Sequence, residues 1–192
     1  MKLLSGSCAR LACVALAGLI VGCATLLRTP KARLRAAQSA VASWSGSSRL
    51  SAAMMIDKYG PPDRVEAGRL VWNDKALCTE LIAWNVEPPA GAGGGDIEST
   101  VAYPVPPENR KALVEFSSLL RVSVNGTELS ARSASPNLNF LLLNLAHEVI
   151  QGIKTPAQAR DFLSTAGKTS PYMQGLLFPP DPTKRGPYPV RF

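Results

Sequence analysis

The sequence predicts a single α+β domain in which a small antiparallel sheet, made of two hairpins, packs against three to four helices. Short runs rich in Val, Ile, Leu and Trp, separated by turn residues, indicate strands at residues 69–73, 77–86 and 97–103 and a hairpin of two strands within residues 120–131. Longer segments with apolar residues at helical spacing lie before and after these strands. Such an order is typical of the α+β class, and a domain at residues 48–170 is long enough to bury a core.

The domain is expected to open with a helix that begins at Ser47 or Ser48 and runs through Lys58. Serine favours a helix start because its side chain accepts a hydrogen bond from a free backbone N–H of the first turn. Gly60 and the two prolines after it end the helix, since proline cannot continue one. Three apolar residues lie at helical spacing in this segment: Leu50, Ala53 and Met54.

Two strands follow the first helix, at residues 69–73 and 77–86. The short link at residues 74–76 predicts that they pair as an antiparallel hairpin. Residues 87–95 form a loop rich in proline and glycine, which suits a surface excursion or a mobile flap. A further strand is expected at residues 97–103.

The second hairpin is predicted around Asn125-Gly126, because both residues tolerate the positive φ of a type I′ turn. A two-residue loop would place Val124 opposite Thr127. Continued along the strands, this register gives one apolar face and one polar face. The apolar pairs farther from the turn are Val122 with Leu129 and Leu120 with Ala131.

Three helices are expected in the second half of the domain, at residues 107–118, 135–151 and 155–167. Each has a proline at its first turn, and Ser135 and Thr155 are good N-caps for the last two. The middle helix has an apolar surface broad enough for a central helix buried on most sides. Its apolar residues include Leu138, Leu141, Leu142, Leu145, Val149 and Ile150.

The N-terminus has the layout of a secretory signal peptide at residues 1–22. Lys2 and Arg10 precede an apolar run at residues 11–21, and Gly22 then precedes Cys23. Residues 20–23, Ile-Val-Gly-Cys, resemble the lipobox of bacterial lipoproteins, in which the cysteine becomes the acylated first residue. Because two or more acyl chains hold a protein stably in a bilayer, the lipid bilayer is the first expected partner.

The alternative to cleavage is an uncleaved anchor helix, since residues 11–27 carry no charge. Residues 23–47 are expected to be the lipidated cysteine and a partly helical tether, and residues 171–192 a Pro-rich tail. The expected location is the periplasmic face of the bacterial outer membrane, because Ala24 follows the cysteine rather than an aspartate. An inner-membrane anchor is the alternative.

The cysteines and charges change meaning after such processing. Only Cys78 would remain as a thiol in the folded part, where a buried thiol and an intermolecular disulfide are the two interpretations. The chain has a formal charge of +7, with 21 basic and 14 acidic residues. From Ala36 onward there are 15 basic and 14 acidic residues. A domain so nearly neutral, with few aromatic residues, argues against a nucleic-acid partner.

The residues that carry reactive groups are few. His147, the only histidine, lies beside Glu148 on the central helix, on a polar stripe with Asn144 and Gln151. No second histidine accompanies it, so no zinc site and no cofactor are expected. A pocket near His147, Glu148 and Cys78 is the candidate site for a small-ligand binder or a hydrolase. The alternative is that this stripe is the exposed or capped face of a buried helix.

Aromatic residues offer another possible site. Trp44, Tyr59, Trp72 and Trp84 have the amphipathic rings that line peptide or glycan grooves, although their spacing also suits a core.

Several segments resemble a family of bacterial envelope lipoproteins that has no established activity. The resemblance covers residues 42–178 and implies an envelope location and a shared fold, but no catalytic residue transfers. A weaker likeness links the helix, Gly-Pro stop and hairpin to the small lipoproteins of outer-membrane assembly machinery. The segments that carry the main resemblance are Trp44-Ser45-Gly46-Ser47, the YGPPD run at 59–63, the RLVWN run at 69–73 and residues 139–146.

The sequence therefore favours a lipid-anchored, non-enzymatic envelope protein that binds or scaffolds another envelope component. Its strand pairs, the loop at residues 87–95 and the tail are the candidate contact surfaces.

Overall fold

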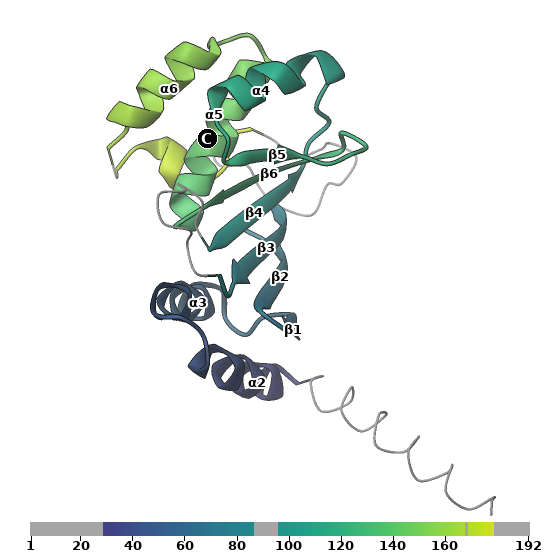
Figure 1. The fold of residues 1–192 in the computed structure, drawn as a ribbon, viewed down its shortest axis with the longest axis vertical. Coiled ribbons are helices and arrows are strands. Elements are labelled where there is room, and N and C mark those ends of the chain that lie inside the picture. The colour runs from purple at the N-terminus through teal and green to yellow at the C-terminus, as the bar shows by residue number, and fades with distance from the viewer. Residues whose placement is uncertain (1–28, 87–95, 168, 179–192) are drawn as a thin grey trace, which may run out of the picture.

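The computed structural model describes residues 29–86, 96–167 and 169–178, which form one domain (Figure 1). Its helices are α2 (Pro30–Ala42), α3 (Gly46–Tyr59), α4 (Arg110–Phe116), α5 (Pro136–Ile150) and α6 (Pro156–Thr165), with short 3-10 turns η1 (Pro107–Asn109) and η2 (Pro171–Met173). Its strands are β1 (Arg64–Glu66), β2 (Arg69–Lys75), β3 (Cys78–Trp84), β4 (Ile97–Ala102), β5 (Leu120–Val122) and β6 (Glu128–Ser133). The predicted α+β class is confirmed.

The strands form one antiparallel sheet of six strands rather than two separate hairpins. Their order is β1-β2-β3-β4-β6-β5. Strand β4 joins the two hairpins, because Ser99 pairs with Leu81 of β3 on one side and with Ala131 of β6 on the other. Strand β1, which the sequence did not indicate, pairs with β2 at one edge.

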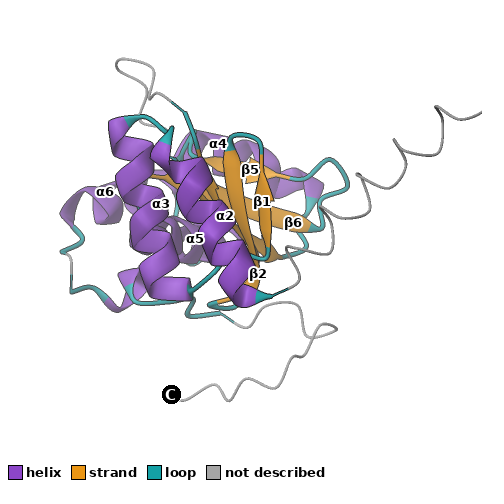
Figure 2. Cartoon of the chain, turned by 90° about the horizontal axis from the view of Figure 1, so that it is seen from below, coloured by secondary structure: helices purple, strands orange, loops and turns teal. Residues whose placement is uncertain are grey.

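The helices cover one face of this sheet (Figure 2). The sheet residues that pack into the main apolar core alternate along the strands, as expected for a sheet with one buried face. They include Leu70, Trp72, Leu81, Ala83, Ile97, Val101, Leu129 and Ala131. Val71, Ile82 and Ala102 are buried but lie outside that core, on the opposite face.

Helix α5 is the central helix that the sequence predicts. Its N-cap Ser135 accepts a hydrogen bond from the backbone N–H of Leu138 at 3.3 Å, and Gly152 follows its end with a φ of 70°. Residues on most of its circumference are buried, including the run from Asn139 to Ala146. The following helix, α6, begins with the predicted capping box between Thr155 and Gln158. Local caps thus fix where both helices start.

The buried side of α3 differs from its apolar pattern. Ser48, Ala52 and Met55 are buried, whereas the side chains of Leu50 and Met54 are 73% and 41% exposed. The cause is the hydroxyl of Ser48, which donates to the backbone oxygen of residue 86 at 2.8 Å and accepts from its N–H at 3.2 Å. This pair of hydrogen bonds turns the serine side of the helix toward the sheet.

The packed region extends beyond residues 48–170 at both ends. Helix α2, which falls within the expected tether, buries Ala37 and Val41, and the indole of Trp44 is buried after it. At the other end, Phe178 of the expected tail is also buried. The predicted signal peptide, Cys23, the loop at residues 87–95 and residues 179–192 lie outside the described residues.

The hairpin register around Asn125-Gly126 is as predicted, but its turn is not. Leu120 pairs with Ala131 and Val122 with Leu129. The backbone N–H of Ser123 donates to the oxygen of Glu128, so the loop has four residues rather than two. Gly126 has a φ of 73°, whereas Asn125 is not among the residues with positive φ. The expected type I′ turn is therefore wrong at this position.

A two-residue turn occurs instead between β2 and β3, where Lys75 pairs with Cys78. Its two central residues, Ala76 and Leu77, have φ values of 52° and 67°. Side chains with a Cβ disfavour this left-handed region, so the turn is strained.

Within the ranges that the structure describes, no helix is both long enough and apolar enough to cross a bilayer.

The strained turn gives a prediction in which one kind of substitution has opposite effects at two sites. Ala76→Gly should raise the free energy of unfolding by about 0.5 to 1 kcal/mol, because glycine adopts positive φ without steric cost. Ala53→Gly, at an exposed position inside α3, should lower it by about 1 kcal/mol. Urea unfolding of both variants measures the difference, and a loss of stability in both would contradict the strain at Ala76.

Candidate functional site

The structure places the residues of the candidate pocket in two separate parts of the molecule. His147 and Glu148 lie near the end of α5, and Cys78 is the first residue of β3, after the strained turn. Neither a hydrogen bond nor an ion pair joins Cys78 to His147 or Glu148 within the described residues. The structure thus brings His147 and Glu148 together with other partners, but not with Cys78.

His147 is held by aromatic residues from two other segments. The hydroxyl of Tyr103 lies 2.8 Å from its Nδ1, and the ring of Phe178 stacks on its ring at a centroid distance of 4.7 Å. Gln151 donates to the Tyr103 hydroxyl at 3.4 Å, which leaves the Tyr103 proton free to bond Nδ1. Burial lowers the pKa of His147, and the neighbouring Glu148 opposes this only in part. A neutral imidazole that accepts at Nδ1 fits this site.

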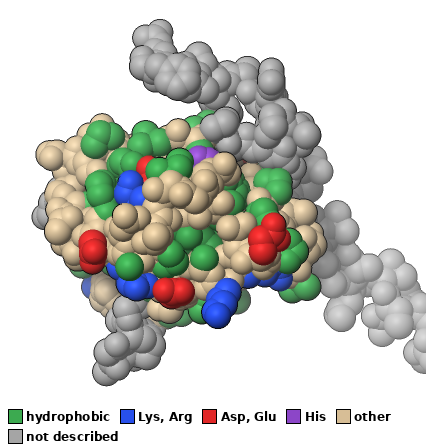
Figure 3. Space-filling view, turned by 90° about the horizontal axis from the view of Figure 1, so that it is seen from above, with side chains coloured by type: hydrophobic (Ala, Val, Ile, Leu, Met, Phe, Trp, Pro, Cys, Tyr) green, Lys and Arg blue, Asp and Glu red, His purple; other side chains and the backbone are tan. Residues whose placement is uncertain are grey.

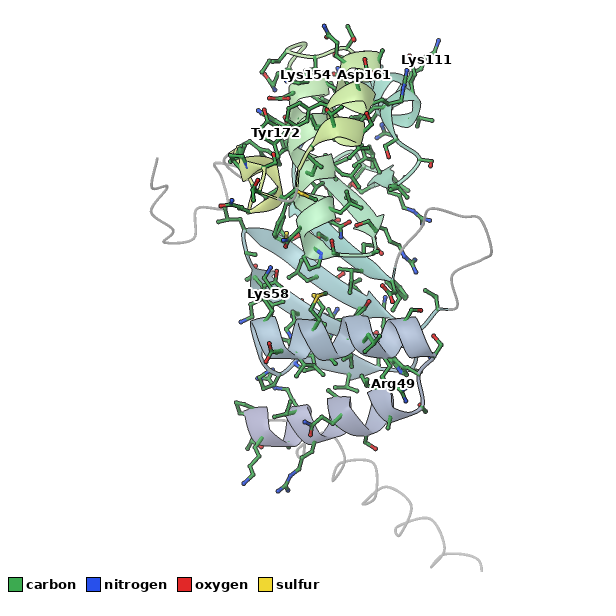
Figure 4. All side chains as sticks on the ribbon, turned by 90° about the vertical axis from the view of Figure 1, so that its left-hand side faces the viewer. Arg49, Lys58, Lys111, Lys154, Asp161 and Tyr172 are labelled. Atoms are coloured by element: carbon green, nitrogen blue, oxygen red, sulfur yellow. The ribbon has the colours of Figure 1, made fainter. Side chains whose placement is uncertain are left out.

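Glu148 is engaged with one residue before α6 and one residue after it. One carboxylate oxygen accepts a hydrogen bond from the hydroxyl of Tyr172 at 2.6 Å, and the other lies 3.0 Å from the ammonium of Lys154. The hydrogen bond to Glu148 is the main cause that raises the pKa of Tyr172 to about 12. Figure 4 shows Tyr172 and Lys154 at the end of the molecule that carries α5 and α6.

Asn144, one turn earlier on α5, binds the backbone of the segment that follows α6. Its amide nitrogen donates to the oxygens of Tyr172 and Gly175 at 3.0 and 2.8 Å, and its amide oxygen accepts from the N–H of Leu177 at 2.8 Å. The polar stripe of α5 therefore holds residues 171–178 in place. Of the two interpretations of this stripe, the capped face of a buried helix describes these contacts.

Cys78 is a core thiol. Its side chain is 2% exposed, and burial raises its pKa to about 12. Thiol chemistry requires the thiolate, which burial disfavours here. Burial, with a smaller contribution from Cys78, also raises the pKa of Tyr59 to about 12. Within the described residues, no group of three or more His, Cys, Asp or Glu side chains has the arrangement of a metal site.

A second candidate site lies on the face of the sheet that turns away from the helices. A shallow concavity of about 530 Å³ opens there. We call this surface the open sheet face, and its concavity is lined by Thr79, Glu80, Glu98, Thr100, Arg121, Val122, Ser123, Glu128 and Ser130. The sequence predicted a polar face on the second hairpin and named the strand pairs as contact surfaces, but it did not indicate that the polar residues of β3, β4 and β6 join in one concavity.

Strand register brings the polar side chains of the open sheet face together. Thr100 pairs with Glu80 of β3 on one side and with Ser130 of β6 on the other. Two residues before Thr100 on β4, and on the same face, Glu98 accepts a hydrogen bond from the indole N–H of Trp84 at 3.0 Å. Carboxylates and hydroxyls thus form rows across three strands, and these groups accept hydrogen bonds from a polar partner.

Charged residues continue this surface toward the β1 edge. Arg64 bridges Glu66 and Glu80 at 2.9 and 2.7 Å, and Arg69 also contacts Glu66. These hydrogen bonds, that of Arg69 first, lower the pKa of Glu66 below its usual value. The guanidinium group of Arg69 makes a cation–π contact with the ring of Trp84, with its Cζ 5.2 Å from the ring centroid.

The aromatic residues proposed for a groove divide between the core and this face. Trp44 and Trp72 are buried in the core, and Tyr59 packs against it. Trp84 alone of the four lies on the open sheet face, where Arg132 is 4.9 Å from its ring centroid.

Comparisons with protein-family models, with curated proteins and with solved structures found no match to this chain.

Asn144 gives a stability prediction. Asn144→Ala should lower the free energy of unfolding by about 1 to 2 kcal/mol, because it removes three hydrogen bonds to partly buried backbone groups of residues 172–177. Asn137→Ala, at an exposed position on the same helix, should change it by no more than about 0.5 kcal/mol. Thermal or urea unfolding measures both changes, and equal small losses would show that Asn144 does not hold this segment.

His147 gives a prediction for pH. Because burial lowers the pKa of folded His147 below its usual value of 6.5, the unfolded chain takes up the proton first. The free energy of unfolding is therefore highest above about pH 6.5 and falls as the pH drops through that value. His147→Gln, which cannot take up this proton, should show a flatter profile between about pH 5.5 and 7.

No other histidine titrates in this window, so the comparison isolates one group. Parallel profiles for the two proteins would contradict a half-buried, neutral His147.

Proposed function

We propose that this chain is a lipid-anchored protein of the bacterial envelope that binds another envelope component through its open sheet face. The anchor is Cys23, acylated after removal of residues 1–22. The bound component is a polar partner, since carboxylates and hydroxyls line the concavity that would receive it.

One observation carries the choice of a binding function. The reactive groups of the candidate pocket are engaged within the fold, whereas the open sheet face has no helix of the described residues across it. His147 packs between Tyr103 and Phe178, and Cys78 is buried as a thiol. A nucleophile and its base must be in hydrogen-bond contact, and this pair is not.

The side chains on the open sheet face limit which chemical class of partner could bind there. Glu80, Glu98 and Glu128 line the concavity with four hydroxyl side chains, and Arg121 is its one basic residue. Such a surface accepts hydrogen bonds more than it donates them. It suits a protein segment that presents Lys, Arg or backbone N–H groups.

Site-specific photocrosslinking in intact cells tests this proposal. A photoreactive residue at Thr100, in the concavity, should give a discrete crosslinked product of higher mass. The same residue at Asp161, exposed on α6, should give at least about threefold less product. Thr100 is half-buried and Asp161 exposed, so unspecific collisions alone would favour the control site.

A double substitution tests whether the crosslinked product depends on the negative charge of the open sheet face. Glu98→Lys and Glu128→Lys together should abolish crosslinking from Thr100, because the introduced lysines would repel the positive charges of the proposed partner. Crosslinking that persists unchanged in this variant, or that is equal at Thr100 and Asp161, would contradict the proposed binding face. The mass of the mature N-terminus tests the anchor separately: an unmodified chain that keeps Met1 would exclude acylation of Cys23.

A further inference from the structure

The excess of basic over acidic residues in this chain comes entirely from its first 59 residues. Residues 1–59 contain eight Lys or Arg and one acidic residue, Asp57, whereas residues 60–192 contain 13 of each sign. Of the basic residues in this part, five lie on α2 and α3. The two-helix layer at one end of the domain is therefore cationic, and the rest of the chain is neutral.

Three of these five basic residues are free to face a partner. Arg33 is paired with Asp63 at 2.9 Å, and Lys58 donates to the side chain of Asn137 at 3.3 Å. Lys31, Arg35 and Arg49 are exposed, and no ion pair engages them within the described residues.

These residues share one surface with apolar groups. Lys31 and Arg35 lie on the same stripe of α2 as Gln38 and Ala42, which line a groove of about 350 Å³ between α2 and α3. Arg49 and the acidic Asp57 lie at the α3 side of this groove, so one carboxylate accompanies the three free basic side chains. The exposed side chains of Leu50 and Met54 lie beside them on α3. We call this surface the α2–α3 face. Figure 2 shows the two helices side by side on the end of the molecule that faces the viewer.

The opposite end of the domain differs in charge. Figure 3 shows Lys or Arg and Asp or Glu side chains together along the margin of that end, with hydrophobic side chains between them. In Figure 4, Arg49 and Lys58 mark the α3 end, and Lys111 lies at the far end. The end seen in Figure 3 thus carries side chains of both signs, whereas Lys and Arg outnumber Asp and Glu on α2 and α3.

Chain length places this end near the lipid anchor. Six residues lie between Cys23 and Pro30, the first residue of α2, so seven Cα-to-Cα steps join the two. Even a fully extended chain of this length spans no more than about 25 Å. If Cys23 is acylated, α2 begins within that distance of the headgroups, which is close enough for its basic residues to reach them.

We propose that the α2–α3 face rests on the anionic phospholipid headgroups of the bilayer that holds Cys23. Lys31, Arg35 and Arg49 attract the headgroups, and Leu50 and Met54 contact the interface between headgroups and acyl chains. This inference rests on the proposed lipid anchor. Its consequence is a fixed orientation, in which the α4–α6 end points away from the membrane.

The test measures orientation with the full chain, purified with its lipid and reconstituted into vesicles. A fluorophore is attached at Leu50→Cys or, as the matched control, at Asp161→Cys, with Cys8 and Cys13 replaced by Ser. Cys78 is buried and does not compete for the label. The vesicles contain phosphatidylcholine alone or with about one third phosphatidylglycerol, plus a lipid with a quencher on its headgroup.

With phosphatidylglycerol, quenching at Leu50→Cys should exceed that at Asp161→Cys by about threefold or more, and high salt should remove the difference. Quenching at the two labelled positions should also become equal when three substitutions are combined: Lys31→Glu, Arg35→Glu and Arg49→Glu. The same reversal at Lys75, Lys111 and Arg160, which lie outside both proposed surfaces, should leave the difference intact. Equal quenching at the two sites, or quenching that ignores phosphatidylglycerol, would overturn the inference.

The mass of the purified chain separates this inference from the anchor itself. An acylated Cys23 with equal quenching at both sites would leave the anchor standing and remove the docking of the α2–α3 face. An unmodified Cys23 would remove the anchor, while quenching at Leu50→Cys that requires phosphatidylglycerol and Lys31, Arg35 and Arg49 would still support the docking.

Discussion

The packing of α5 against β4 and β6 is the interaction on which the rest of this structure depends. Leu141, Leu142, Leu143 and Leu145 of this helix are at most 1% exposed. Burial of each such side chain contributes on the order of 2 kcal/mol, which makes α5 the largest single contributor to the core. Helices α4 and α6 and the segment 171–178 all pack onto α5, so its position decides theirs.

A helix buried on most sides leaves little surface for its polar residues. Asn139, Asn144, His147 and Glu148 therefore have partners inside the fold, such as the backbone of Ile97 for Asn139 and the hydroxyl of Tyr103 for His147. Groups that look reactive in the sequence thus have structural roles. Because the helices occupy one side of the sheet, the other side is left to present polar residues, and that is where we place binding.

The parts of the fold that local physics determines were predictable from the sequence. The caps at Ser135 and Thr155 and the register of the second hairpin depend on residues that are near one another in the chain, and the structure has them as expected. The buried side of α3 was not predictable, because Ser48 faces inward through its bonds to residue 86, 38 positions away. Left-handed conformations at Ala76 and Leu77 also have no signal in those two residues.

The candidate sites follow the same division. The partners of His147 are 44 and 31 residues away, at Tyr103 and Phe178, so its packing could not be read from α5 alone. The open sheet face exists only because β4 pairs with both β3 and β6, which no local pattern specifies. Its polar residues were visible in each strand, but their assembly into one surface was not.

Cysteine accessibility in intact cells tests the central claim, that the open sheet face is covered by a partner, most directly. Ser130→Cys on this face and Lys111→Cys on α4 would each be labelled with a small maleimide, in cells and in purified protein, with buried Cys78 as a silent background. The account predicts that Ser130→Cys is labelled several-fold more slowly in cells than when purified, while Lys111→Cys reacts at the same rate in both. Equal rates in cells and in purified protein at Ser130→Cys would contradict it.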